Sequence, residues 1–441
     1  MTSERHITAP KLTHGLLAGN GMLNLVGQVL PLAIGLVVIP ILVRDLGVER
    51  FGVLALIWLI VGYFSLFDFG LGKAITLVVA KKFGSDEEHE ISRVVWTGAS
   101  LLGALGLLVL LVLFFSSDWL VTSVFQISAE FRTEAGQSIA LLGISVPLVL
   151  VSIGLRGVLE AFQQFKFITL VRVPVGIWNF VGPLIALGIA DDLRLVVIFL
   201  LFGRALAFVL FFLRCTHIVS PPSIANLSRS ATNSILKVGG WLAVSNIVGP
   251  LTAFLDRFVV AAMLPISAVA YYTTPHQIVT RVLIVPAAIL AAFFPAFATI
   301  SKSSPIDSYR LLRRATLYIV TFVGPIVFVV VAFAEPLISI WIGPEFAANS
   351  FEVTRLLGVA VLINCVGIVA QMYIQAIGRP DITAKFSLIE LPVFATYLVV
   401  LVDGFGIIGA GIAWIIRVTI STVLLSILAN LLTHGPLKEE V

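Results

Sequence analysis

Long apolar runs separated by short polar segments set the pattern of this chain. Each run reaches the roughly 20 residues that a helix needs to cross the hydrocarbon core of a bilayer. The runs show no alternation with a period of two, so transmembrane strands are not expected. The pattern predicts an all-α integral membrane protein of about 12 transmembrane helices. The expected spans lie near 17–43, 52–80, 94–117, 138–160, 168–190, 195–213, 233–263, 268–300, 315–340, 353–377, 384–402 and 405–432.

The composition supports a membrane protein over a soluble one. Hydrophobic residues make up 59% of the chain and charged residues 12%, whereas soluble domains average about 45–50% and about 25%. The mean hydropathy is +1.08. The net charge of +4 is interpreted as an excess of basic residues in inner loops and within the spans, and no nucleic-acid partner is expected. Because most loop Lys and Arg face one side when the N-terminus is placed inside, both termini are expected to be cytoplasmic.

A polar stretch over 214–232 follows the sixth expected helix and contains Pro221 and Pro222. It predicts an N-terminal six-helix lobe over 1–213, a cytoplasmic linker over 214–232 and a C-terminal six-helix lobe over 233–441. A short match between Asn24-Leu-Val-Gly27 and Asn246-Ile-Val-Gly249 favours an internal repeat. Both segments lie on helices that start inside, so the lobes would be related by a pseudo-two-fold axis along the membrane normal.

Basic residues within the expected spans outnumber acidic ones. Each Arg or Lys at the bilayer centre costs roughly 2.5–3.5 kcal/mol, so some of them must line a wet cavity, pair with acids or extend to the interface. Arg204, Arg281 and Arg417 lie nearest the middle of their spans and favour a cavity; for Arg156 and Arg172, near inner ends, both readings stay open. A cationic cavity fits an anionic substrate, above all a phosphate. The candidate substrate-binding residues are Lys73, Arg156, Arg172, Arg204, Arg257, Arg281 and Arg417.

Acids and amides complete the candidate site. Asp68, Glu160, Asp256 and Glu390 are candidates for coupling to an ion, although Glu160 and Glu390 lie near inner helix ends, where an interfacial position is the alternative. Asp256 and Arg257 are neighbours that point in different directions on a helix and need not pair. An amide strip lining the cavity is expected from Asn20, Asn24 and Gln28, which share one helix face, and from Asn246 in the second half; hydrogen bonds between helices would explain it equally.

Enzymatic chemistry finds little support in the sequence. The six histidines and two cysteines show no metal-ligand spacing, and no nucleophile lies beside a base. No polar segment is long enough to form an ATPase domain. We therefore expect a transporter with no cofactor, no metal and no catalytic residue.

Several motifs together make the chain recognisable. They are Phe67-Asp-Phe-Gly-Leu-Gly72, Gly239-Gly-Trp-Leu-Ala-Val-Ser-Asn246, Trp341-Ile-Gly-Pro-Glu-Phe346, Gln375-Ala-Ile-Gly-Arg-Pro-Asp-Ile382 and Gly406-Ile-Ile-Gly-Ala-Gly-Ile-Ala-Trp414 with Arg417. In these motifs the chain resembles the bacterial polysaccharide transporter family. This family contains the O-antigen and exopolysaccharide flippases, and its superfamily also contains the multidrug and toxin extruders. Asp256 and Arg257 lie in a further matching motif, Leu255-Asp-Arg-Phe258, and Arg417 follows the last motif.

The resemblance implies two lobes that alternate in access and a polyprenyl-pyrophosphate-linked oligosaccharide moved to the outer leaflet of the bacterial plasma (inner) membrane. It implies a monomer that works beside glycosyltransferases and a polysaccharide polymerase, in O-antigen, lipopolysaccharide or exopolysaccharide synthesis. An ion-coupled multidrug extruder of the same superfamily is the alternative, which the excess of intramembrane bases disfavours. A membrane glycan polymerase or ligase is a more distant alternative, because no large outer loop is present.

Overall fold

The computed structural model describes residues 14–64, 68–82, 90–125, 127–219, 221, 227–300 and 305–434. Within these ranges, the side chains of residues 14–29 and 238–247 and of a few other positions lie outside the description. All regular structure in the described ranges is helical, as the hydropathy pattern predicts.

Two compact units make up the chain, residues 1–247 and residues 248–441. We call them unit 1 and unit 2. The boundary falls inside one long helix, α8, which contributes its first part to unit 1 and its last part to unit 2. The predicted division into lobes over 1–213 and 233–441 with a linker between them stays a prediction.

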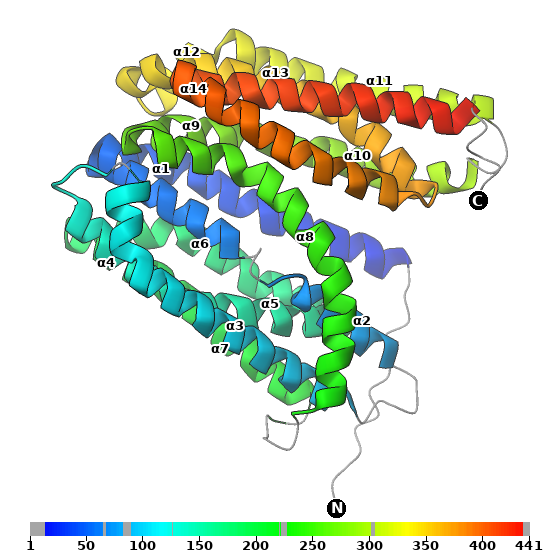
Figure 1. The fold of residues 1–441 in the computed structure, drawn as a ribbon, viewed down its shortest axis with the longest axis horizontal. Coiled ribbons are helices and arrows are strands. Elements are labelled where there is room, and N and C mark those ends of the chain that lie inside the picture. Colours follow the sequence, from blue (N-terminus) through cyan, green and yellow to red (C-terminus); the bar gives the residue numbers. More distant parts are fainter. Residues whose placement is uncertain are drawn as a thin grey trace, which may run out of the picture. The chain divides into compact units, whose positions relative to one another are not determined.

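The helices of unit 1 cover the predicted spans but are divided at different places. Figure 1 shows their arrangement. They are α1 (His14–Phe64), α2 (Leu71–Lys82), α3 (Ile91–Trp119) with a short π-helix η2 (Leu120–Val124), α4 (Arg132–Gly143), α5 (Ser145–Ala161), α6 (Phe165–Ile189), α7 (Leu193–Ile218) and the start of α8 (Arg229–Met263). Helix α5 is the central element, since α2, α3, α6 and α7 all pack against it.

Unit 2 is built around α13, against which α9, α10, α11, α12 and α14 pack. Figure 1 shows α11, α13 and α14 running side by side. The helices are α9 (Ile266–Val279), the 3-10 turn η4 (Thr280–Leu283), α10 (Ile284–Ile300), α11 (Pro305–Ala332), α12 (Ala334–Trp341), α13 (Pro344–Ala376) and α14 (Pro380–His434).

Two glycines separate spans that are otherwise continuous helix. Helix α1 contains Gly47 with φ 73° and ψ 164°, and α14 contains Gly406 with φ 60° and ψ −138°. These backbone conformations are essentially restricted to glycine. Each long helix is therefore two spans joined at a sharp break, in agreement with the predicted boundaries between 17–43 and 52–80 and between 384–402 and 405–432.

The expectation of an unbroken helix over 52–80 is wrong. Helix α1 ends at Phe64, α2 begins at Leu71, and Phe69 and Gly70 between them have φ of 48° and 74°. The Asp68 carboxylate accepts a hydrogen bond of 2.9 Å from the backbone N–H of Gly70. The Asp68 side chain thus provides a hydrogen-bond partner for a backbone N–H that would have none at the helix break.

Three other expected spans also consist of shorter pieces. Ile144 separates α4 from α5, η4 separates α9 from α10, and Phe333 separates α11 from α12. Hydropathy does not detect these breaks because the apolar run continues through them.

The described helices present an apolar outer surface, as contact with lipid requires. Eight helices in the described ranges are long and apolar enough to cross a membrane, and the longest of them, Pro380–Thr433, holds two spans because of Gly406. On α3, Leu108, Val112 and Phe115 point outward, with Phe115 80% exposed. Such continuous exposed apolar surface is unstable in water and stable in a bilayer. The chain is a multi-pass membrane protein of about twelve spans, all of them helical.

Candidate functional site

A cluster of charged and polar residues lies inside unit 2. We call it the Asp256 cluster; it consists of Asp256, Arg257, Tyr272, His276 and Arg417. The first two lie on α8, the next two on α9 and the last on α14. Asp256 stands seven residues before the end of α8, so its backbone lies about 10 Å inside the span. Charged groups at this depth are costly and mark functional sites by default.

Asp256 is the anion at the centre of the cluster and is 1% exposed. The Tyr272 hydroxyl donates a hydrogen bond of 2.6 Å to its Oδ2. The Nε2 atom of His276 lies 3.3 Å from the same oxygen. Tyr272 and His276 are four residues apart, which places both side chains on one face of α9. The carboxylate therefore has a hydrogen-bond donor and a titratable partner on the neighbouring helix.

Arg257 contacts Asp256 despite their adjacency in the sequence. Its Nε lies 3.7 Å from Asp256 Oδ1, which corrects the expectation that the two need not pair. The guanidinium also donates a 2.6 Å hydrogen bond to the Ala253 carbonyl and lies 4.4 Å from the centre of the Phe254 ring. These contacts hold its charge near the helix backbone.

Arg417 joins the Asp256 cluster to a polar cavity of about 200 Å³ within unit 2. Its guanidinium lies 5.2 Å from the Phe394 ring centre and 6.0 Å from that of Trp414. Glu390 also lines the cavity and accepts a hydrogen bond from Ser421. The remaining polar lining consists of Thr252, Asn364, Gln371, Thr383, Ser387 and Thr422. Arg417 and Glu390, singled out separately from the sequence, thus share one cavity.

Arg281 lies elsewhere in unit 2. It belongs to η4, where the span formed by α9 and α10 changes to 3-10 geometry, and its side chain is exposed on the unit. No ion pair of Arg281 occurs among the described residues. An exposed cation at a helix break in the middle of a span is compatible with a wet surface, and its role stays a prediction.

A second charged group lies in unit 1, on α2, α5, α6 and the turn before α2. Arg156 and Glu160 form an ion pair of 3.2 Å along α5, and both are about one-third exposed. Arg172 on α6 lies close enough to both to interact electrostatically. Asp68, buried at the turn before α2, interacts with Lys73 and Arg156. The structure thus brings together five of the residues predicted from the sequence, with three cations and two acids.

Arg204 is buried in unit 1 and 7% exposed. Its Nη1 donates a 3.0 Å hydrogen bond to the Ser145 hydroxyl, at the break between α4 and α5, while its Nη2 has no partner among the described residues. No acid in the described part of the chain acts on it. It is a cation in the middle of a span with a single neutral partner.

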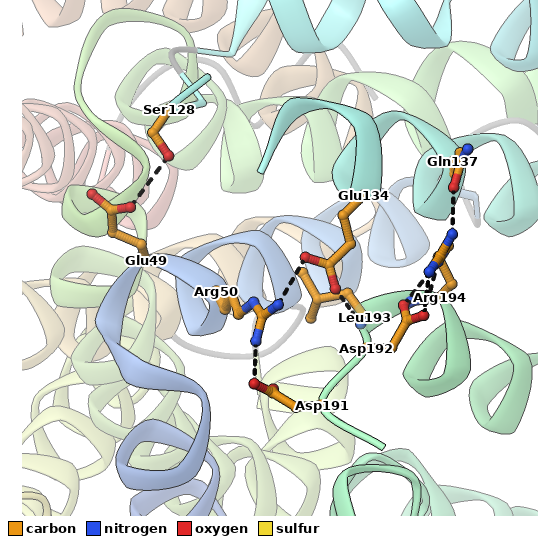
Figure 2. A network of polar contacts seen from close by, with 9 residues as sticks. All are labelled: Glu49, Arg50, Ser128, Glu134, Gln137, Asp191, Asp192, Leu193 and Arg194. Carbon is orange, nitrogen blue, oxygen red and sulfur yellow. Dashed lines mark hydrogen bonds and ion pairs between the residues drawn. The ribbon is translucent and has the colours of Figure 1, made fainter. Parts of the chain in front are cut away.

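Ion pairs join the ends of several unit 1 helices (Figure 2). Arg50 on α1 lies 3.3 Å from Glu134 on α4 and 2.6 Å from Asp191 in the turn before α7. Glu134 also accepts a 2.7 Å hydrogen bond from the backbone N–H of Leu193. Asp192 caps α7 and is paired with Arg194, and this hydrogen bonding lowers the pKa of its carboxyl. The network links α1, α4 and α7 and stabilises their packing.

The predicted amide strip is not described at the level of side chains. Asn20, Asn24 and Gln28 belong to α1 and Asn246 to α8, and their side chains lie outside the described residues. His276 and Tyr272, in contrast, are described in the structure but were not predicted from the sequence as site residues. A histidine and a tyrosine four residues apart inside an apolar span were the available signal.

Comparison of the solved structures gives the class of the fold. The chain has a TM-score of 0.79 with a multidrug resistance MATE family transporter of the MOP superfamily in an inward-facing conformation, at 14% identity, covering 94% of this chain and 96% of that one. With a MOP superfamily transporter from Pyrococcus furiosus the TM-score is 0.63 at 13% identity, covering 99% and 100% of the two chains. The protein therefore has the MOP transporter fold.

The family follows from the sequence. Residues 17–301 match the model of the family described as "Polysaccharide biosynthesis protein", and this chain belongs to that family. A Shigella flexneri protein whose name assigns it to O-antigen transport is 27% identical over 409 residues, which is 92% of this chain and 96% of the relative. A Haloferax volcanii protein named as the flippase AglR is 23% identical over 410 residues, or 89% and 79% of the two chains. The suspected family is confirmed, and its named relatives are transporters.

Proposed function

We propose that this protein is a flippase that moves a polyprenyl-pyrophosphate-linked oligosaccharide from the inner to the outer leaflet of the bacterial plasma membrane. The observation that carries the proposal is the likeness along 92% of the chain to a relative named for O-antigen transport. The charge pattern is consistent with it. Both units hold arginines at membrane depth, and a planar guanidinium is suited to the oxygens of a pyrophosphate.

The polar and the apolar parts of the substrate would follow different paths. The pyrophosphate and sugars need a polar, cationic path, which Arg417 with the polar cavity in unit 2 and Lys73, Arg156 and Arg172 in unit 1 would supply. The prenyl chain needs no such path, because it is as apolar as the surrounding lipid. Transport would proceed by alternating access of the lobes over 1–213 and 233–441, joined by the 214–232 segment.

We propose that either an ion gradient or consumption of the product outside drives the cycle. Uptake of a proton or sodium ion at an intramembrane acid would return the empty protein to its starting state. Asp68 and Asp256 are the buried candidates, and Glu160 and Glu390 are the partly exposed ones. We further propose that both termini are cytoplasmic and that the protein acts as a monomer beside glycosyltransferases and a polymerase.

A multidrug extruder is the second candidate, because the structural neighbour with a TM-score of 0.79 is a multidrug resistance transporter. A cationic drug would require acids to predominate along its path. In unit 1 the group of Lys73, Arg156, Arg172, Asp68 and Glu160 contains three cations and two acids. In unit 2 Arg417 and Glu390 share the cavity. The balance favours an anionic substrate.

The test is made in a strain that lacks the gene. Lipid-linked oligosaccharide should accumulate, shielded from a probe added outside, and surface polysaccharide should be lost. Restoring the gene should restore both. Unchanged surface glycan together with new sensitivity to cationic dyes would instead support the extruder.

A further inference from the structure

The Asp256 cluster contains a buried histidine whose bonding is incomplete. His276 is 4% exposed, and neither of its ring nitrogens has a hydrogen-bond partner of good geometry among the described residues. Asp256 Oδ1 and the Nε atoms of Arg257 and Arg417 are likewise buried and unsatisfied. Buried polar atoms in proteins are nearly all satisfied, so several unsatisfied ones in one place require a specific explanation.

The charges around His276 come from two helices, α8 and α14. Arg257 and Asp256 act on it from α8, and Arg417 acts on it from α14. On α9 itself, the Tyr272 hydroxyl is bonded to Asp256, while α13, which also packs against α9, adds no charged group to those acting on His276. With a neutral imidazole the cluster carries two cations and one anion. Protonation of His276 would add a third cation, held 3.3 Å from the Asp256 carboxylate.

We propose that His276 and Asp256 form the proton-binding site of this transporter and that its protonation controls how strongly Arg417 attracts an anion in the polar cavity of unit 2. The proposal rests on the proposed function, in which the substrate is anionic. A proton bound at the pair cancels the carboxylate charge that otherwise weakens the field of Arg417. The proton adds to Nε2 of His276, which then forms an ion pair with Asp256, and no other bond changes.

Thermodynamic linkage between proton binding at the His276–Asp256 pair and anion binding at Arg417 gives the direction of the coupling. An anion bound at Arg417 stabilises the protonated pair, so anion binding raises the pH at which the pair takes up its proton. By reciprocity, the anion binds more tightly at low pH by the same factor. Coupling of this kind is typically between about 5-fold and 150-fold; with one charge gained at a buried site, we expect about tenfold.

Trp414 provides a direct readout of the proton. Its ring centre lies 5.1 Å from that of His276, and an imidazolium in contact with an indole quenches its fluorescence. Wild-type protein in nanodiscs is titrated from about pH 8 to about pH 3, a range that also covers a buried histidine faced by two arginines. The fluorescence of Trp414 is obtained by subtracting the fluorescence of the Trp414→Phe variant from that of the wild type.

The expected result is a single titration of Trp414 that disappears in His276→Gln and persists in His217→Gln, since His217 is exposed at the end of α7. Inorganic pyrophosphate should move the midpoint upward by about one pH unit, corresponding to the tenfold coupling. Arg417→Ala should abolish that movement. The ionisation of pyrophosphate itself is common to all variants and cancels in the comparison.

Tyr272→Phe keeps the proposal testable if His276→Gln fails to fold. It removes the hydrogen bond to Asp256 and leaves the ring in place. The carboxylate is then less stabilised, so the pair should bind its proton at higher pH, by about one unit for a hydrogen bond to a charged group.

An unchanged Trp414 titration in His276→Gln would overturn the proposal, as would a midpoint that pyrophosphate does not move. Both results leave the flippase assignment intact if the wild type still flips lipid-linked glycan in vesicles. Absence of flipping by the wild type would reject the proposed function, whatever the fluorescence shows.

Discussion

At the scale of single residues, the arginines inside the spans have different surroundings. Arg417 lies against two aromatic rings and lines a polar cavity. Arg204 is buried with the Ser145 hydroxyl as its described partner. A buried cation without an acid costs stability, so its presence in a folded protein points to a use. The two residues therefore give different tests of the cationic path.

Replacing Arg417 by Ala should reduce flipping at least tenfold, because one charged hydrogen-bonding group is lost from the substrate path. Arg417→Lys should recover only part of the activity, since lysine lacks the planar fork. Lys385→Ala is the matched control: Lys385 is 77% exposed and should be dispensable. Flipping is measured in vesicles at equal amounts of inserted protein, and normal flipping by Arg417→Ala would contradict a role for the cavity.

Arg204→Met should separate stability from activity. A hydrophobic side chain of similar length removes the buried charge, and we expect the protein to gain about 1 kcal/mol or more in stability. Flipping should nevertheless fall, because Arg204 is one of the substrate-binding residues predicted from the sequence. Thermal unfolding in detergent and flipping in vesicles are measured on the same preparation. A stabilised variant with full activity would show that Arg204 is not on the path.

At the scale of helices, breaks inside apolar runs decide where charged side chains lie. Gly406 begins the last span, and Arg417 lies eleven residues further, about 16 Å into it. The turn at Asp68 ends one helix and places Lys73 on the next, against α5. The depth of both cations thus follows from backbone geometry as well as from sequence.

Gly406→Ala should destabilise the protein by about 1–3 kcal/mol, the usual cost of a strained backbone conformation. No atom lies within 4 Å of the position that a Cβ would occupy, so crowding adds nothing. Gly404→Ala is the control in the same helix: its surroundings are equally open and its φ is ordinary. Thermal unfolding should show a loss for the first variant and none for the second; equal behaviour would mean that the break at Gly406 is not fixed.

The spans, the two glycine breaks and the family could be predicted from the sequence, because hydropathy, positive-inside charge and motifs are local signals. The turn at Asp68 was not predicted, although Asp68, Gly70 and Gly72 are residues typical of a turn. The partnership of Asp256 with His276 depends on packing between α8 and α9, which no spacing encodes. The sequence also could not show that Arg417 and Glu390 share a cavity, because they lie on different spans of α14.

At the scale of the whole molecule, the proposed orientation makes a prediction about accessibility. Cys215 and Cys365 are both fully buried, so the native protein should react little with a polar maleimide. Leu227→Cys, at a position that is 52% exposed, should be labelled from the cytoplasmic side only. Ile340→Cys, at a position that is 87% exposed, should be labelled from outside only. Labelling of either position from the opposite side would reverse the assignment.

The central claim is that this family member flips a lipid-linked glycan, and the most direct measurement follows that lipid in a strain lacking the gene. Polyprenyl-pyrophosphate oligosaccharide is extracted and its exposure to an external glycan probe is compared with that in the complemented strain. The account predicts accumulation on the cytoplasmic side, with loss of surface polysaccharide that the wild-type gene restores and Arg417→Ala does not. Equal exposure of the lipid at the outer surface with and without the gene would contradict it.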